Sequence, residues 1–315
     1  MSSKRRWSCR DVPLKLCLRW FSALAILSSS FSVADAGTLT VVDASAHYPE
    51  GPVWHGGLLY VEYSTGNIKR WDGAHATIFW HRDGCGPSGL FDFHGHWLIA
   101  CYDSNSIVEI DTAGTQVRES LADSQGKPIV GPNDFAADGH GGVYVSASGV
   151  YDVKAPITGT VFHIAADGHT ITEVANTLHY PNGLTVDRDG ANLLVAEMLA
   201  GRIVTFPIGK DGVLGARSVW ARLRDLAPPT AAEDAYNGPD GLKLGPDGNY
   251  YIAQNGSGRV IVVGEDRKLV RMIEVATPFV TNLAFGAPGT GAVFVTGVFD
   301  EWHEPYSGAV YRWQP

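Results

Sequence analysis

One short motif, a proline followed by a polar residue and usually a glycine, recurs along this 315-residue chain and constrains its fold more than any other feature. The copies are Pro49-Glu50-Gly51, Pro87-Ser88-Gly89, Pro132-Asn133-Asp134, Pro181-Asn182-Gly183, Pro239-Asp240-Gly241 and a degenerate Thr281-Asn282-Leu283. Their polar residues are separated by 38, 45, 49, 58 and 42 residues. One four-stranded blade of a β-propeller takes roughly 40–50 residues. The spacing therefore predicts an all-β fold, a propeller of six four-stranded blades.

The segments between the copies support this prediction, because they contain short apolar runs separated by tight turns. In the fourth unit, residues 184–186, 193–196 and 202–206 are such runs, and an Asp-Gly turn at 189–190 lies between the first two. This pattern is typical of β-hairpins. The strand at residues 38–42 is left over, and we expect it to pair with residues 309–313 and close the ring, which would cover the open strand edges. A two-sheet sandwich is the alternative, but it does not require one motif in register six times.

The first 36 residues are typical of an export signal. A basic start is followed by an apolar stretch at 20–27 and by Ala34-Asp35-Ala36, which fits the small-x-small cleavage rule. We therefore expect a signal peptide at residues 1–36, a single propeller domain at 37–315, and an exported protein that is periplasmic or secreted. The alternative is an uncleaved anchor, but the apolar stretch is shorter than the roughly 20 residues that span a bilayer. Arg5-Arg6 leaves twin-arginine export open.

Charge and cysteine content narrow the possible partners. The formal net charge of −9 divides into +4 on residues 1–36 and −13 on residues 37–315. This acidic domain argues against nucleic acid and anionic membranes as partners. After cleavage only Cys85 and Cys101 remain, and they are either one disulfide or two buried thiols.

The polar residues of the motif form the candidate site. At one register of the repeat stand Glu50, Ser88, Asn133, Asn182, Asp240 and Asn282, all with side-chain oxygen atoms. A plain turn would explain any single copy. However, each unit already has its own hairpin turn, and the motif begins the innermost strand, where the units meet. Oxygen ligands suit hard divalent cations. We expect one such ion, Ca²⁺ first, with Mg²⁺, Mn²⁺ or Zn²⁺ as alternatives.

These stretches also resemble a known family. Glu50-Gly51-Pro52 with Trp54, Asn133-Asp134, Pro181-Asn182-Gly183-Leu184 and Pro239-Asp240-Gly241 are similar to the signature stretches of the regucalcin/gluconolactonase family. The resemblance covers most of residues 45–315 and implies a six-bladed propeller that hydrolyses sugar lactones with a divalent metal. It implies that Glu50, Asn182 and Asp240 hold the metal, and that Asn133 binds the metal or the substrate. One position departs, because Gly131 stands where regucalcin has a sugar-binding arginine.

The expected activity is therefore metal-dependent opening of a sugar lactone or related cyclic ester. Asp240 is the first candidate for the base that activates water, and Asp134 is the second. Ser88, Asn133 and Asn282 are the expected substrate contacts. His179 and His303 are weaker candidates for the base. Residues 227–236 are expected to form a loop over the funnel mouth.

Several aromatic side chains are candidates for the pocket wall, namely Trp54, Phe91, Phe135, Tyr151, Phe299 and Trp302. Two other functions remain open at this stage. One is a non-catalytic binding propeller with a structural Ca²⁺ ion, because propellers often serve as binding modules. The other is a propeller enzyme of different chemistry, such as a strictosidine-synthase-like enzyme.

Overall fold

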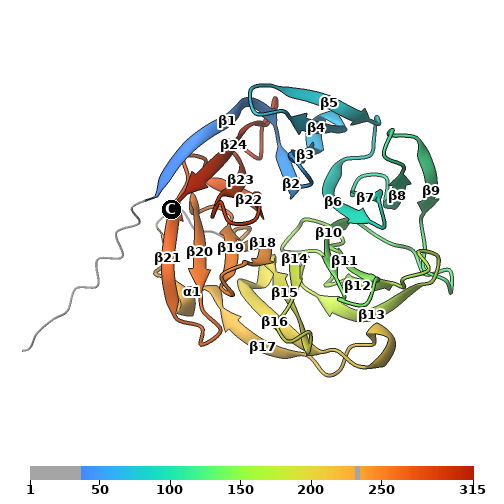
Figure 1. The fold of residues 1–315 in the computed structure, drawn as a ribbon. Coiled ribbons are helices and arrows are strands. Elements are labelled where there is room, and N and C mark those ends of the chain that lie inside the picture. Colours follow the sequence, from blue (N-terminus) through green and yellow to red (C-terminus); the bar gives the residue numbers. More distant parts are fainter. Residues whose placement is uncertain (1–36, 231–234) are drawn as a thin grey trace, which may run out of the picture. The chain divides into compact units, whose positions relative to one another are not determined.

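A computed structural model describes residues 37–230 and 235–315, which form six four-stranded antiparallel sheets around a central axis (Figure 1). The innermost strand of each blade contacts that of the next blade, and the last contacts the first. The ring is therefore closed, and the predicted six-bladed propeller is confirmed. The expected signal peptide lies outside the described residues.

The blades follow one another along the chain. Blade one holds β2 (Pro49–Trp54), β3 (Leu58–Glu62), β4 (Asn67–Trp71) and β5 (Ala76–His81). Blade two holds β6 (Pro87–Phe93), β7 (His96–Cys101), β8 (Ser106–Ile110) and β9 (Gln116–Ser120). Blade three holds β10 (Pro132–Ala137), β11 (Val143–Ala147), β12 (Gly159–Ile164) and β13 (Ile171–Leu178).

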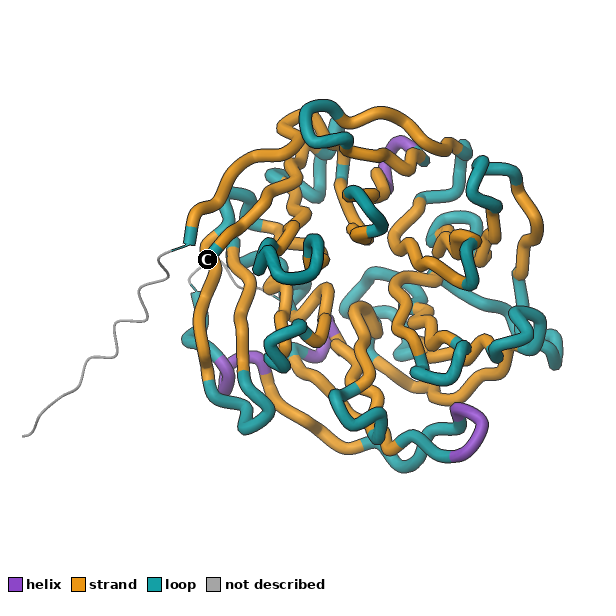
Figure 2. The backbone as a smooth tube through the Cα atoms, in the orientation of Figure 1, coloured by secondary structure: helices purple, strands orange, loops and turns teal. Residues whose placement is uncertain are grey.

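Blade four holds β14 (Pro181–Val186), β15 (Asn192–Glu197), β16 (Arg202–Pro207) and β17 (Ser218–Arg222). Blade five holds β18 (Pro239–Leu244), β19 (Tyr250–Gln254), β20 (Arg259–Val263) and β21 (Leu269–Glu274). Blade six holds β22 (Phe279–Phe285), β23 (Val293–Val298), β24 (Ser307–Gln314) and β1 (Thr38–His47). The helical turns are short (Figure 2): α1 (Leu223–Leu226), η1 (Tyr63–Thr65), η2 (Met198–Ala200) and η3 (Lys210–Gly212). No helix within the described ranges has the length and apolar character needed to cross a membrane.

The first strand closes the ring. β1 pairs antiparallel with β24, and Leu39 lies opposite Trp313. The predicted closure by the N-terminal strand is thus confirmed. Asp43 in β1 also reaches blade one, because it accepts hydrogen bonds from the Tyr60 hydroxyl and the Lys69 ammonium group. β1 therefore ties the last blade to the first.

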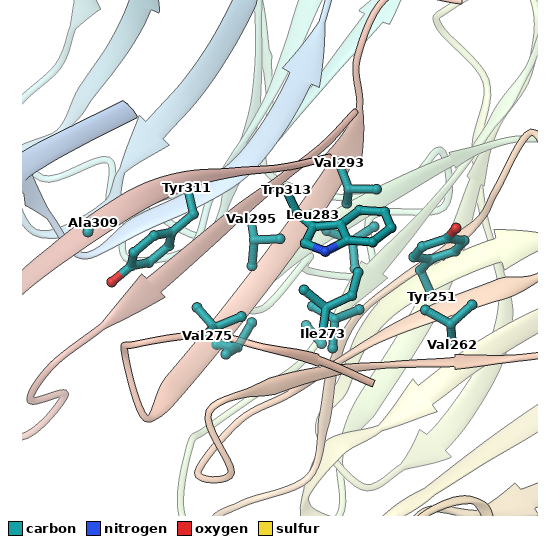
Figure 3. Packing of buried hydrophobic residues seen from close by; sticks show 13 residues of the cluster. Tyr251, Val262, Ile273, Val275, Leu283, Val293, Val295, Ala309, Tyr311 and Trp313 are labelled. Carbon is teal, nitrogen blue, oxygen red and sulfur yellow. The ribbon is translucent and has the colours of Figure 1, made fainter. Parts of the chain in front are cut away.

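The hydrophobic core consists of separate clusters between neighbouring blades. Figure 3 shows the cluster between blades five and six, where Tyr251, Ile273, Val295 and Trp313 are among the buried side chains. A second cluster, between blades one and two, contains Cys85 and Cys101. These two cysteines form a disulfide, which decides between the two possibilities that the sequence leaves open.

The repeated motif is a β-bulge at the same place in all six blades. The pairing register of each innermost strand shifts there, for example between Glu50 and Val53 in β2 and between Pro239 and Leu242 in β18. A bulge changes the direction of a side chain locally. It therefore turns the polar residue of each motif toward the central axis.

The glycine of the motif allows neighbouring inner strands to approach closely. A Cβ atom on Gly183 would lie 2.2 Å from the backbone nitrogen of Leu242 in the next blade. A Cβ atom on Gly89 would lie 2.2 Å from the carbonyl oxygen of Asn133. No side chain fits at such distances, so glycine is needed where the ring is narrowest.

Candidate functional site

The bulges bring five of the six motif residues to one cavity of about 220 Å³ near the axis. Its wall includes Glu50, Ser88, Asn133, Asn182 and Asp240. These side chains come from β2, β6, β10, β14 and β18, so each of five blades contributes one group. All five are at least nine-tenths buried.

Three side-chain oxygens of this group are buried without any hydrogen-bond partner: Oδ1 of Asn133, Oδ1 of Asn182 and Oδ1 of Asp240. The amide nitrogen of Asn182 contacts the sulfur of Met198 at 3.7 Å. A buried acceptor without a partner costs about 1–3 kcal/mol, so three in one cavity require an explanation. A bound cation would satisfy all three oxygens at once.

The two carboxylates of the motif are in an electrostatically unfavourable position. Burial raises the pKa of Asp240 well above its usual value, and the negative charges of Glu50 and Glu301 add to this effect. Burial also raises the pKa of Glu50, although its Oε2 accepts hydrogen bonds from the Gly51 N–H (2.8 Å) and from Asn282 Nδ2 (3.2 Å). A positive charge between these groups would relieve the repulsion.

The chemistry of the donors therefore fits a hard divalent cation, held by the carboxylates of Glu50 and Asp240 and the amide oxygens of Asn133 and Asn182. Within the described ranges, no three His, Cys, Asp or Glu side chains are grouped as a metal site would require. The two amides are thus essential to the candidate ligand set. Their role as ligands remains a prediction.

Asn282, the sixth motif residue, lies beneath the cavity rather than in its wall. Its Nδ2 donates to Glu50 Oε2 and, at 3.4 Å, to Asp134 Oδ2. Asn282 is 1% exposed. It therefore supports Glu50 from below, and the structure does not place it where a substrate would lie.

Asp134 points to the opposite end of the channel. Its Oδ2 accepts a hydrogen bond from Lys243 Nζ at 2.7 Å, and both residues line a second cavity of about 440 Å³. Asn133 lines the first cavity and Asp134 lines the second, although the two residues are neighbours in the same bulge. The geometry thus separates Asp134 from the cavity of Asp240 and disfavours it as the base.

Two polar residues of this site are absent from the sequence-based prediction. Asn255 follows β19, and its Nδ2 lies 3.4 Å from both Asp240 Oδ2 and Glu301 Oε2. Glu301 is buried in the wall of the cavity, on the loop between β23 and β24. Neither residue belongs to the repeat, so no periodic signal marks it.

Aromatic side chains line the mouth of the cavity, and we call them the aromatic collar: Tyr48, Tyr63, Tyr102, Tyr151, Tyr180, Trp302 and Tyr306. The sequence indicated only Tyr151 and Trp302. A usable signal existed for two others, because Tyr48 and Tyr180 directly precede the motif prolines.

The other candidates lie elsewhere. Trp54, Phe91 and Phe135 line the second cavity, and Phe299 is 48% exposed outside both. Neither His179 nor His303 belongs to the wall of the first cavity. Of the expected loop at 227–236, residues 231–234 lie outside the described part of the chain.

Comparison with known proteins adds a family. Residues 48–299 match the family described as SMP-30/gluconolactonase/LRE-like. A pentonolactonase of Haloferax volcanii is 26% identical over 300 residues, which are 86% of this chain and 92% of that protein. Lactonase drp35 of Staphylococcus aureus is 26% identical over 223 residues, which are 67% of this chain and 60% of that protein. A solved gluconolactonase of Xanthomonas campestris has a TM-score of 0.73 at 19% identity, with 90% of each chain covered.

Proposed function

Because this chain belongs to the SMP-30/gluconolactonase/LRE-like family, we propose that it is a metal-dependent lactonase. The observation that carries the proposal is the convergence of three unpartnered oxygens, on Asn133, Asn182 and Asp240, at one cavity. The names of two curated relatives, a pentonolactonase and a lactonase, support the reaction class. The substrate is a small cyclic ester.

We assign the metal site to Glu50, Asn133, Asn182 and Asp240, and Ca²⁺ is the preferred ion because all four ligands are oxygens. When bound, a divalent cation would polarise the lactone carbonyl and stabilise negative charge on its oxygen. The chain's own contribution is to hold the four ligands in place. Asn282 and the Gly51 N–H hold Glu50, and Asn255 holds the second oxygen of Asp240.

Asp240 is the proposed general base, because it is a buried carboxylate in the cavity wall and its Oδ1 has no hydrogen-bond partner. It accepts a proton from a water molecule as the water oxygen bonds to the carbonyl carbon. The bond between that carbon and the ring oxygen then breaks, and the ring oxygen takes up a proton. One lactone and one water thus give one hydroxy acid.

We also propose that residues 1–36 are removed and that the mature protein starts at Gly37 outside the cytoplasm. The Cys85–Cys101 disulfide supports this proposal, because disulfides persist mainly in oxidising compartments. N-terminal sequencing of the protein purified from its native source provides the test. Finding Met1 or Ser2 on cytoplasmic protein would refute the proposal.

The lactonase proposal is tested with protein that is stripped by chelator and reloaded with Ca²⁺, Mg²⁺, Mn²⁺ or Zn²⁺. Proton release is then measured on a panel of sugar, aliphatic and aromatic lactones. We expect turnover only with a cation, and a loss of kcat of roughly 100-fold or more in Asn133→Ala. Asn192→Ala, at the first residue of β15 in blade four and outside the cavity wall, is the matched control. Tight ion binding without hydrolysis of any lactone would mean that the ion is structural and that the protein is a binding propeller.

A further inference from the structure

The aromatic collar forms a continuous series of ring contacts around the mouth of the cavity. The ring centroids of Tyr48 and Tyr63 are 5.3 Å apart, those of Tyr63 and Tyr102 are 6.1 Å apart, and those of Tyr102 and Tyr180 are 6.4 Å apart. Tyr151 lies 4.9 Å from Tyr180 and is stacked on Trp302 at 6.0 Å. A molecule that enters the cavity therefore meets aromatic surface on several sides.

Three phenol groups of the collar donate hydrogen bonds to the protein. The Tyr63 hydroxyl donates to Asp103 Oδ1, the Tyr102 hydroxyl donates to the Gly149 carbonyl oxygen, both at 2.7 Å, and the Tyr151 hydroxyl donates to the Tyr236 carbonyl oxygen at 3.2 Å. The Ser88 hydroxyl in the wall likewise donates to the Pro132 carbonyl oxygen at 3.0 Å. A sugar lactone would bury several hydroxyl groups that need partners, and each unpaired one would weaken binding.

The wall also contains no cationic side chain among the residues that the structure describes there. Position 131, two residues before Asn133, is a glycine with φ +60°. A Cβ atom on Gly131 would lie 2.9 Å from Tyr102 Cε2 and 2.9 Å from the Gly149 carbonyl oxygen. Tyr102 thus occupies the space that a side chain at 131 would use.

The backbone supports a functional role for the collar. Tyr48 and Tyr180 have φ of +48° and +56°, in the left-handed region that bulky residues rarely adopt. At the matching position before the motif proline, blades two and three have glycine, Gly86 and Gly131, at φ +56° and +60°. Glycine at this position is therefore compatible with the fold, and a tyrosine is not required there for folding. Strain of this kind concentrates at ligand sites.

From these observations we propose that the cavity takes a small lactone that carries an aromatic ring and few hydroxyl groups, in preference to a sugar lactone. The ring lies against the collar while the ester carbonyl reaches the cluster of Asn133, Asn182 and Asp240. The volume of about 220 Å³ is below the roughly 300–1,000 Å³ typical of drug-sized ligands, so the substrate is small. This inference rests on the proposed lactonase function.

Three lactones test the proposal on the Ca²⁺-loaded protein: isochroman-3-one, δ-valerolactone and δ-gluconolactone. The first two share a six-membered ring and an alcohol leaving group, so they differ mainly in the fused benzene ring. We expect kcat/KM for isochroman-3-one to exceed both others by about tenfold or more. An equal or higher value for δ-gluconolactone, through stacking of the sugar on the tyrosines, would overturn the proposal.

Substitutions in the aromatic collar test whether these residues cause the preference for isochroman-3-one. Trp302→Leu, at a site that is 49% exposed, and Tyr151→Leu with Trp302→Leu should raise KM for isochroman-3-one by a larger factor than KM for δ-valerolactone. Phe299→Leu is the matched control, because it is an exposed aromatic residue of the same loop outside the wall. A preference for isochroman-3-one that survives the double variant would refute the role of the collar.

Binding without turnover separates this proposal from the lactonase proposal. The lactam 1,4-dihydro-3(2H)-isoquinolinone and piperidin-2-one are compared by calorimetry, because neither lactam is readily hydrolysed. Tighter binding of the aromatic lactam supports the collar even if no lactone is turned over, in which case only the lactonase proposal fails. Equal binding of both lactams refutes the collar proposal whether or not the protein is a lactonase.

Discussion

At the scale of single residues, the candidate site brings together buried acidic groups that repel one another. Glu50, Asp240 and Glu301 gather in one wall, and three neighbouring oxygens have no hydrogen-bond partner. Such groups destabilise the fold unless a ligand compensates for them. Removing one carboxylate charge should therefore weaken cation binding and leave the cation-free protein at least as stable as the parent.

Asp240→Asn tests this expectation. Without cation the variant should be at least as stable as the parent, because one repulsive charge is removed. With Ca²⁺ at about 100 times its Kd the parent gains about 2.7 kcal/mol, and the variant should gain much less. Thermal unfolding in chelator and in Ca²⁺ measures both effects. Asp247→Asn, in the hairpin turn of the same blade, should keep the full gain. An unchanged gain in Asp240→Asn would place the ion elsewhere.

The ion pair of Asp134 and Lys243 gives a second prediction. Asp134 is 3% exposed, and the ammonium group of Lys243 is 2.7 Å from its Oδ2. Lys243→Met should lower the free energy of unfolding by about 3–5 kcal/mol, since it leaves a buried carboxylate without its cation. Combining it with Asp134→Asn should recover much of this loss. Urea denaturation of the three variants checks the prediction, and a Lys243→Met variant as stable as the parent would contradict it.

The sequence allowed part of this site to be predicted. Glu50, Asn133, Asn182 and Asp240 come together because one register of a repeat necessarily converges at the axis of a ring. Asp134 and Asn282 belong to the same motif but do not line this cavity, and the repeat alone does not show this. Glu301 and Asn255 arise from connections outside the repeat, where no period constrains which residue faces the cavity.

At the scale of elements, the bulge of each inner strand turns the polar side chain of the motif toward the axis and so forms the site. It requires the inner strands to approach closely, and the glycine after the polar residue makes this possible. The three residues of the motif therefore set both the position of the polar side chain and the spacing of the inner strands. A change in the glycine should disturb the neighbouring ligands as well as the fold.

The substitution Gly183→Ala tests this link between the spacing of the inner strands and the position of the candidate ligands. Its Cβ atom would collide with backbone of the next blade at Leu242 and Asp240, so the strands must move apart. We expect a loss of roughly 1–3 kcal/mol in the free energy of unfolding, and weaker Ca²⁺ binding because Asn182 and Asp240 separate. Gly57→Ala, where the nearest atom is 3.6 Å away, is the control. Equal stability of the two variants would show that the inner strands tolerate a wider spacing.

At the scale of the whole molecule, ring closure depends on β1, which pairs with β24 and reaches blade one through Asp43. Burial alone would raise the pKa of Asp43, but hydrogen bonds from Tyr60 and Ser45 and the charge of Lys69 outweigh it and lower the pKa to about 2. A carboxylate with a lowered pKa stabilises the fold above its unfolded pKa of about 4. This contribution is lost as the pH falls from about 4 through 2.

Asp43→Asn should therefore flatten the pH dependence of stability. The parent should lose about 2 kcal/mol more than the variant between pH 5 and pH 2. Tyr60→Phe removes one of the hydrogen bonds and should give an intermediate slope. The measurement is the free energy of unfolding from denaturant titrations at several pH values. Parallel curves for the parent and Asp43→Asn would exclude Asp43 as a contributor to acid stability.

The architecture was largely predictable, because a ring of similar units leaves a period in the sequence. The pairing of β1 with β24 followed from an unpaired strand at each end of the domain. The short helix α1 and the collar residues Tyr63 and Tyr102 were not predictable in this way. They belong to connections between strands, whose lengths differ from blade to blade.

The two cavities at opposite ends of the channel share no wall residue, and the buried contacts of Asn282 with Glu50 and Asp134 lie between them. The candidate site thus belongs to the first cavity and not to the second. Under the proposed lactonase function, a neutral substrate enters and an acidic product leaves through the first cavity. The acid then leaves from among carboxylates of its own sign, so the same negative charges that suit a cation also favour release of the product.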